Sequence, residues 1–137
     1  MKKLFVDTNI VIDLLSHRET FYEEAANLFS LADRNQLQLA VSSLTIVHIG
    51  YVLLGQLNSN NVKSILRNLR LIVKVLHVDD KIIGLALNDE NFLDFEDGLQ
   101  YFTAIEHGQQ GIITRNLKDF KKSKLPTMTA KQLLARI

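Results

Sequence analysis

The chain has 137 residues, of which 47% are hydrophobic, and this length supports one well-packed core but not two domains of ordinary size. Its 16 Lys and Arg nearly balance 15 Asp and Glu, and a net charge of +1 argues against a generally basic nucleic-acid coat. The absence of Cys excludes disulfides and thiolate zinc sites. Apolar stretches stay short of the roughly 18 residues that span a bilayer. We expect one cytoplasmic domain over residues 1–137, with no membrane segment.

Short apolar runs alternate along the chain with longer stretches of helical period. The runs predict strands at residues 4–6, 37–41, 71–78 and 111–114, with a fifth at 126–128. The periodic stretches predict helices at 21–32, at 44–55, from 60 or 61, after 79–80, after 94, and from 129 to 137. Because parallel strands need crossover connections, this alternation predicts an α/β fold with a parallel sheet of four to five strands, covered by helices on both faces.

The helix expected at residues 44–55 is apolar on nearly every side, which predicts that it lies deep inside the domain. This helix and the Phe-rich segments also offer more hydrophobic surface than one small sheet covers. We therefore expect a homodimer, although the sequence does not locate its interface.

Polar residues follow the predicted strands directly. Asp7 follows the first strand, Ser42 the second, and Arg115 and Asn116 the fourth. Open parallel sheets place their sites beyond the carboxyl ends of the strands, so we expect these residues at one edge. Asp94, Glu96 and Asp97 begin a helix just before the fourth strand and are expected to point the same way.

Carboxylates gathered at one edge repel each other unless they are protonated or neutralised, and oxygen ligands suit Mg²⁺ or Mn²⁺. Each acid also has an ordinary interpretation. Asp7 is either a ligand or the N-cap of the next helix. Asp94 and Asp97 share a helix face, but acids in a first turn commonly compensate the helix dipole. Asn116 and Asp119 are either site residues or ordinary helix-starting residues.

Four motifs together resemble the PIN domain family in order and spacing over nearly the whole chain. They are Val6-Asp7-Thr8-Asn9-Ile10, Ser42-Ser43-Leu44-Thr45, Asp94-Phe95-Glu96-Asp97-Gly98-Leu99-Gln100 and Thr114-Arg115-Asn116-Leu117-Lys118-Asp119-Phe120. The resemblance implies a three-layer α/β/α sandwich whose acidic cluster binds Mg²⁺ or Mn²⁺ and cleaves RNA. Many small bacterial members resemble the toxin half of a toxin–antitoxin pair of the VapC type, so it also implies a partner antitoxin protein.

When the site residues of the family are matched to positions in this sequence, the resemblance implies that Asp7 and Asp97 are the metal ligands. Asp94, Asn116 and Asp119 would complete the catalytic site. The remaining implied residues contact the substrate or orient Asp7 and water: Thr8, Asn9, Thr114 and Arg115. The alternative interpretation of Arg115 is a simple surface charge. The lysines that follow the site are either phosphate contacts or a solvated loop: Lys118, Lys121, Lys122 and Lys124.

One position departs from the family pattern. Where a Glu usually follows the Ser-x-x-Thr motif, this chain has His48. A neutral imidazole prefers softer transition metals than Mg²⁺, and a protonated one repels any cation. We expect His48 to be either a partner for a neighbouring carboxylate or a buried, hydrogen-bonded histidine. It also supports a second hypothesis, a degenerate PIN-like domain that binds protein or RNA without cleaving it.

Overall fold

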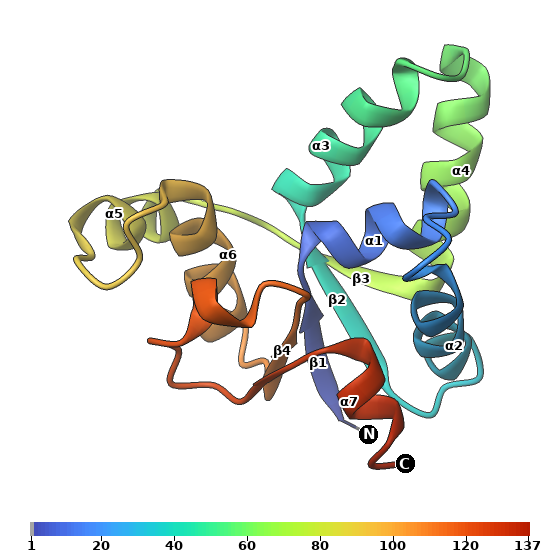
Figure 1. Cartoon of the computed structure of the whole chain (residues 1–137). Coiled ribbons are helices and arrows are strands. Elements are labelled where there is room, and N and C mark those ends of the chain that lie inside the picture. The colour runs from blue at the N-terminus through green and yellow to red at the C-terminus, as the bar shows by residue number, and fades with distance from the viewer. Residues whose placement is uncertain (1) are drawn as a thin grey trace.

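The computed structural model describes residues 2–137 and centres on a five-stranded parallel sheet (Figure 1). Its strands are β1 (Lys3–Val6), β2 (Gln38–Ser42), β3 (Val73–Leu76), β4 (Gly111–Ile113) and β5 (Thr127–Met128). Their order is β3-β2-β1-β4-β5, so the first strand of the chain lies in the middle. In the register, Leu4 pairs with Leu39 on one side and with Gly111 on the other. The predicted parallel sheet is confirmed.

Helices connect the strands. They are α1 (Thr8–Leu15), α2 (Tyr22–Asp33), α3 (Ser43–Leu54), α4 (Ser59–Ile72), α5 (Asp80–Asn88), α6 (Phe95–Glu106) and α7 (Ala130–Leu134), with a 3₁₀ turn at Leu117–Phe120. None of the helices within residues 2–137 combines the length and the apolarity needed to cross a bilayer.

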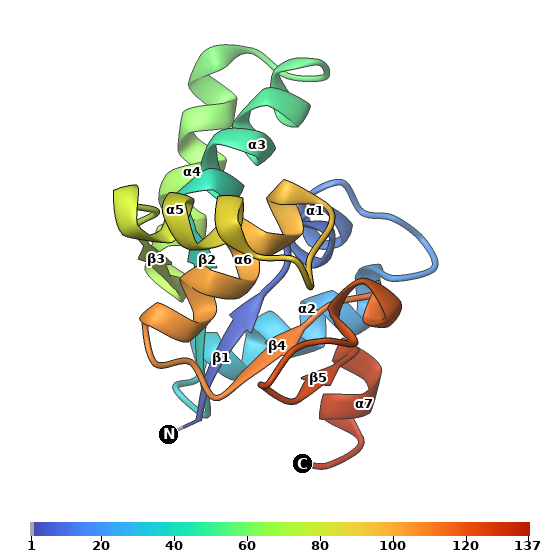
Figure 2. The same ribbon diagram turned by 90° about the vertical axis from the view of Figure 1, so that its left-hand side faces the viewer.

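The side chains of β1 divide the helices between the two faces of the sheet, because successive strand residues point to opposite sides. Leu4 and Val6 pack in the larger core cluster with residues of α1, α2, α3, α4 and α7. Phe5 packs on the other face with Tyr101 of α6 and with Phe120 of the 3₁₀ turn. Helix α5 packs against α6 (Figure 2). The result is the expected three-layer α/β/α sandwich.

Most helices start where a short polar side chain caps the first turn, because such a side chain accepts a hydrogen bond from a free backbone N–H. Asp79 and Asp94 cap α5 and α6 as predicted, and Thr129 forms a capping box with Gln132 at α7. Asn58 caps α4, slightly before the predicted start of that helix. Local side-chain chemistry therefore sets these helix starts.

Two predicted elements are shorter in the structure than expected. The strand expected at residues 71–78 is confined to Val73–Leu76, because Leu71 and Ile72 complete the last turn of α4. A run of apolar and β-branched residues does not itself separate a helix end from a strand start. The last helix ends at Leu134 and does not continue to Ile137.

The prediction that α3 lies deep inside the domain is also wrong. Its buried residues are Thr45, Ile49 and Leu53, whereas Val47 is 66% exposed and Tyr51 is 79% exposed. Helices α3 and α4 form a hairpin that rises beyond the edge of the sheet (Figure 1). One side of α3 is therefore covered by its neighbours and the other faces solvent. The apolar composition of α3 predicted burial on every side, but other elements of the described structure pack against one side of this helix.

Candidate active site

Asp7 lies at the carboxyl end of the central strand and starts helix α1. Its Oδ1 accepts a hydrogen bond from the backbone N of Thr8 at 2.8 Å, so Asp7 is the N-cap of α1. Its Oδ2 accepts from the Thr114 hydroxyl, also at 2.8 Å, which joins the ends of β1 and β4. Asp7 is therefore a helix cap with a carboxylate oriented by the neighbouring strand.

The environment of Asp7 penalises its charged form. Burial raises the pKa of the Asp7 carboxyl, while hydrogen bonds from Thr114, Thr8 and Gln100 act in the opposite direction. The negative charge of Asp119 adds to the rise in pKa. A buried carboxylate with an acidic neighbour is an environment that a bound cation would relieve.

Asp97 is the centre of the acidic cluster. Desolvation first, and then the negative charges of Asp94, Asp7, Asp119 and Glu96, raise the pKa of the Asp97 carboxyl to about 7. These residues come from the end of β1, from the 3₁₀ turn that follows β4, and from the N-cap and first turn of α6, so the structure brings the predicted acids together. Within residues 2–137, none of Asp7, Asp94, Asp97 and Asp119 has a Lys, Arg or His nitrogen within 4.0 Å.

Asp94 has a second, structural role. Its Oδ1 accepts a hydrogen bond from the backbone N of Asp97 at 3.1 Å, which caps α6 and fixes the first turn that carries Asp97. Asp94 is thus the N-cap of the helix predicted to follow it, and its charge still acts on Asp97.

A buried network of polar side chains lies under the acidic cluster and centres on Gln100. Its Nε2 donates to the hydroxyls of Thr8 and Thr45, each at 3.0 Å. Its Oε1 accepts from the Ser42 hydroxyl at 2.6 Å. The Thr8 and Thr45 hydroxyls are 2.8 Å apart and share a hydrogen bond. The network links α1, the end of β2, α3 and α6.

Sequence reasoning gave Gln100 no role. The available signal was its spacing, because Gln100 lies three residues after Asp97 and so on the same face of α6. An amide placed one turn below a site carboxylate is well positioned to organise the residues around it.

The remaining residues predicted to contact substrate or water have varied surroundings. Thr8 belongs to the Gln100 network, and Thr114 also accepts from the backbone N of Asn116 at 3.0 Å. The side chain of Asn116 is exposed. The Oδ1 of Asn9 is buried without a hydrogen-bond partner among the described residues.

His48 on α3 contacts the carboxylate of Glu96, which lies in the first turn of α6. Its Nδ1 lies 3.0 Å from Oε1 of Glu96, and the two side chains are 47% and 51% exposed. The interpretation of His48 as a partner for a neighbouring carboxylate is confirmed, and the buried alternative is wrong. The exposed side of α3 explains the difference, since His48 lies between the exposed Val47 and the buried Ile49.

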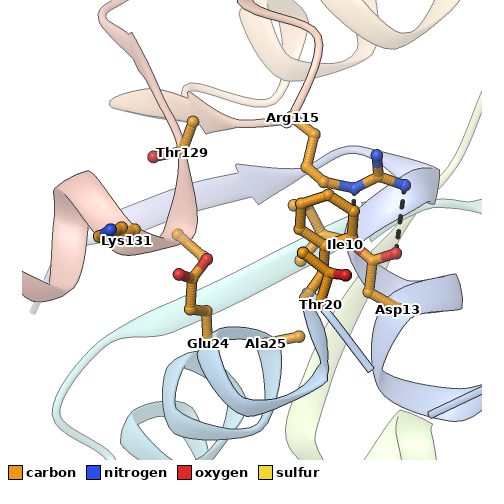
Figure 3. Close-up of a pocket in the computed structure, with 10 residues that line it drawn as sticks. Ile10, Asp13, Thr20, Glu24, Ala25, Arg115, Thr129 and Lys131 are labelled. Atoms are coloured by element: carbon orange, nitrogen blue, oxygen red, sulfur yellow. Dashed lines mark hydrogen bonds and ion pairs between the residues drawn. The ribbon is translucent and has the colours of Figure 1, made fainter. Parts of the chain in front are cut away.

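Arg115 binds the carboxylate of Asp13, which does not belong to the acidic cluster. Its Nε donates to Asp13 Oδ2 at 2.7 Å and its Nη2 donates to Asp13 Oδ1 at 3.1 Å (Figure 3). The guanidinium also lies over the ring of Phe21, 4.2 Å from its centroid. Sequence reasoning overlooked Asp13, although an acid within the apolar stretch from Ile10 to Leu15 was a usable signal.

The donor set at the acidic cluster fits a hydrated hard cation. Within residues 2–137, no three His, Asp or Glu side chains are arranged closely enough to hold a metal ion by themselves. Asp7 and Asp97 supply the oxygen ligands that Mg²⁺ and Mn²⁺ prefer, and Mg²⁺ usually binds through one or two carboxylates while keeping several waters. The uncompensated charge around Asp97 favours such an ion.

A parallel α/β/α sandwich with acidic residues at the carboxyl edge of its sheet defines a protein class whose site suits hard metal ions. A family model described as "PIN domain" matches residues 3–118. The chain therefore belongs to the PIN domain family, as its motifs predicted.

Individual relatives agree with this assignment. Ribonuclease VapC1 of Aquifex aeolicus is 28% identical over 142 residues, covering 98% of this chain and 95% of the relative. A toxin–antitoxin complex from Klebsiella pneumoniae has a TM-score of 0.67 at 25% identity, covering 93% of this chain and 97% of the matched chain. VapBC-1 from nontypeable Haemophilus influenzae has a TM-score of 0.70 at 20% identity, covering 94% and 98%.

Proposed function

We propose that this protein is a metal-dependent endoribonuclease that acts in the cytoplasm. The observation that carries the proposal is the group of acids around Asp97, which raises the pKa of its carboxyl to about 7. Within residues 2–137, no Lys, Arg or His side chain forms an ion pair with the Asp members of this group: Asp7, Asp94, Asp97 and Asp119. The similarity to a ribonuclease of the VapC type supports RNA as the substrate. In this proposal Asp7 and Asp97 hold Mg²⁺ or Mn²⁺.

The chain's own residues prepare the site. Thr8 and Thr114 fix the orientation of the Asp7 carboxylate, and Asp94 fixes the helix turn that carries Asp97. When bound, the ion supplies Lewis-acid stabilisation of charge on the scissile phosphate. Asn116 and Asp119 orient the attacking water, while Asn9 and Arg115 contact the substrate. The exposed lysines beside the site bind RNA phosphates: Lys118, Lys121, Lys122 and Lys124.

The direct test is cleavage of RNA with Mg²⁺ or Mn²⁺ by the parent, Asp7→Asn and Asp97→Asn. Both substitutions keep the side-chain size and remove a charge, and Asp7→Asn also keeps the oxygen that caps α1. We therefore expect folded proteins that have lost cleavage by a factor of about 100 or more. Asp33→Asn, at the exposed end of α2, is the matched control and keeps full activity. Activity that survives both site substitutions would refute the proposal.

The second candidate is a PIN-like domain that binds RNA or protein without cleaving it. His48 favours this candidate, because it replaces the usual carboxylate and pairs with Glu96. Binding of RNA by a parent protein that shows no metal-dependent cleavage would select it. Gain of cleavage in His48→Glu would then show that the missing carboxylate is the cause.

We also propose that an antitoxin protein blocks this site. The support is the likeness to chains from the toxin–antitoxin complexes named above. A short reading frame that overlaps or abuts this one is the expected source. Expression of this chain alone should then arrest growth, and co-expression of the neighbouring product should relieve the arrest. Relief of growth arrest by Asp7→Asn alone would link the toxicity to the acidic site.

We further propose a homodimer formed through the exposed apolar surface of α3 and α5. Its side chains are Val47, Tyr51, Leu54, Ile83 and Leu87. Val47 of α3 and Ile83 of α5 line one shallow apolar groove with Phe95, so the two helices contribute to a common apolar surface. A two-fold contact would bury this surface on both copies. Light scattering should give twice the chain mass for the parent and the single-chain mass for Tyr51→Glu. A monomeric parent would contradict the homodimer.

A further inference from the structure

A cavity lined in part by Arg115 lies between α1, α2 and α7. Its volume is about 320 Å³, at the lower end of the range for small-ligand sites. Ile10, Phe21, Ala25 and Ala130 supply apolar surface. Six polar residues complete the lining: Asp13, Thr20, Glu24, Arg115, Thr129 and Lys131. A cavity that combines apolar surface with hydrogen-bonding groups suits a flat, partly polar ligand.

One wall of the cavity is rigid and flat. Asp13 is only 1% exposed, and it holds the Arg115 guanidinium by two hydrogen bonds. Arg115 in turn lies over the Phe21 ring at 4.2 Å. Nucleobases stack on aromatic rings and on guanidinium planes. Because the guanidinium covers one face of the ring, a base can stack on the outer face of the Arg115–Phe21 pair, which the hydrogen bonds to Asp13 hold in place.

The cavity adjoins the acidic cluster through two chain segments. Helix α1 begins directly after Asp7, and at 1.5 Å per residue Ile10 and Asp13 lie only about 5 and 9 Å further along it. Thr114, which holds Asp7, is followed directly by Arg115. A nucleotide close to the cleaved phosphate can therefore reach the cavity.

The carboxylate of Glu24 is the acceptor group of the cavity that can distinguish one base from another. Its side chain extends from α2 towards Thr129 and Lys131 of the α7 segment (Figure 3). Within residues 2–137, no Lys, Arg or His nitrogen lies within 4.0 Å of its carboxylate. An ionised carboxylate only accepts hydrogen bonds. Guanine presents two adjacent N–H donors on its Watson–Crick edge, whereas the other bases present a donor beside an acceptor.

We propose that this cavity is a guanine-binding subsite for the RNA substrate, with Phe21 and Arg115 as the stacking wall and Glu24 as the acceptor of the guanine N1–H and N2–H donors. The subsite rests on the proposed nuclease function and adds a base preference to it. Lys131, at the rim, contacts a phosphate of the same strand.

The test measures the binding of labelled pentanucleotides to the Asp7→Asn protein, which cannot consume them. UUGUU should bind roughly 5- to 100-fold more tightly than UUAUU, UUCUU or UUUUU, the discrimination expected of one bidentate base contact. Adding Glu24→Gln should remove the preference for guanine. The matched control is Glu23→Gln, which changes the exposed neighbour on the same helix and should preserve the preference.

Equal affinity for the four oligonucleotides, absence of binding, or a preference that survives Glu24→Gln overturns the subsite. A cavity that instead receives an apolar side chain of a partner protein gives the first or second of these results. Cleavage by the parent with Mg²⁺ separates the two proposals. If the parent cleaves RNA without a guanine preference, the subsite fails while the nuclease function stands.

Discussion

Asp13 and Asp97 are both acids on helices, and they differ in whether a cationic side chain of the chain neutralises the carboxylate. Asp13 is buried against Arg115, which donates two hydrogen bonds to it, and Arg18 lies 3.6 Å away. Asp97 is surrounded by other acids, and its pKa rises to about 7. A carboxylate neutralised from within the chain supports the fold. A carboxylate left without a cationic partner is destabilising in the absence of a ligand, which is a mark of a binding site.

The largest expected effect concerns Asp13. Asp13→Ala leaves the guanidinium of Arg115 partly buried without its partner, and breaking such a pair costs about 3 to 5 kcal/mol of unfolding free energy. Urea unfolding at pH 7 should show a loss near the lower value, because Arg115 retains 25% exposure. Asp33→Ala, at an exposed position, should cost far less. Equal losses in the two variants would show that Asp13 is not a structural anchor.

The next effect concerns Gln100. Gln100→Leu leaves the hydroxyls of Ser42, Thr8 and Thr45 without their shared partner and should cost about 2 kcal/mol of unfolding free energy. It should also weaken Mn²⁺ binding by about 10-fold or more, the usual effect of removing a residue that orients a metal ligand.

Thr103→Val is the matched control for Gln100→Leu. Thr103 lies on the same helix and is fully buried, but its hydroxyl donates to the backbone oxygen of Leu99 at 2.7 Å and takes no part in the Gln100 network. We expect lower stability with unchanged Mn²⁺ affinity, measured by calorimetric titration. If Gln100→Leu behaves in the same way, the network has a structural role alone.

Asp97→Asn should have a smaller effect on the free energy of unfolding, and this substitution should stabilise the protein. Because the folded pKa of about 7 lies above the ordinary value of 3.8, the folded state holds a proton that the unfolded state has lost between these pH values. Metal-free parent protein therefore loses stability as the pH rises from about 4 to 7. Asp97→Asn removes this penalty. It should stabilise the protein at pH 8 by about 1 kcal/mol, a value reduced for the partial exposure of Asp97, and much less at pH 4. Thermal unfolding in EDTA measures both, and a pH-independent difference would contradict the assignment.

The smallest effect concerns His48. Its contact with Glu96 joins two half-exposed side chains, so His48→Ala should change the unfolding free energy by less than about 0.5 kcal/mol. His48→Glu replaces the imidazole by a carboxylate beside Glu96, and we expect it to raise Mn²⁺ affinity. Lower Mn²⁺ affinity in His48→Glu would show that the imidazole has a role of its own at the site.

The sequence predicted the parallel sheet and the edge where the acids meet because these depend on local patterns. Apolar runs that end abruptly at Asp7 or Thr114 mark both a strand and its carboxyl end. Capping residues such as Asp94 mark helix starts for the same local reason. Whether Asp7 is a cap or a site acid was left open, and the structure shows a cap whose second oxygen is held by Thr114.

Features that depend on partners distant in the sequence were not predicted. The exposure of α3 depends on how far the hairpin of α3 and α4 extends beyond the sheet, which composition does not contain. The pairing of Asp13 with Arg115 spans 102 residues. The three hydroxyls around Gln100 come from the end of β2, from α3 and from α1. Each of these contacts becomes visible only when the strand order is known.

The position of β1 in the middle of the sheet has a consequence for synthesis. Its partner β4 begins at Gly111, so Asp7 receives the hydrogen bond from Thr114 only after the 107 residues that separate the pair have been made. Contacts of such long sequence separation form late, because the intervening loop must first be closed. A nascent chain that ends before Gly111 carries both Asp7 and Asp97 but cannot orient Asp7. The acidic site is therefore completed only after β4 has joined the sheet, later than the pairing of β1 with β2 can form.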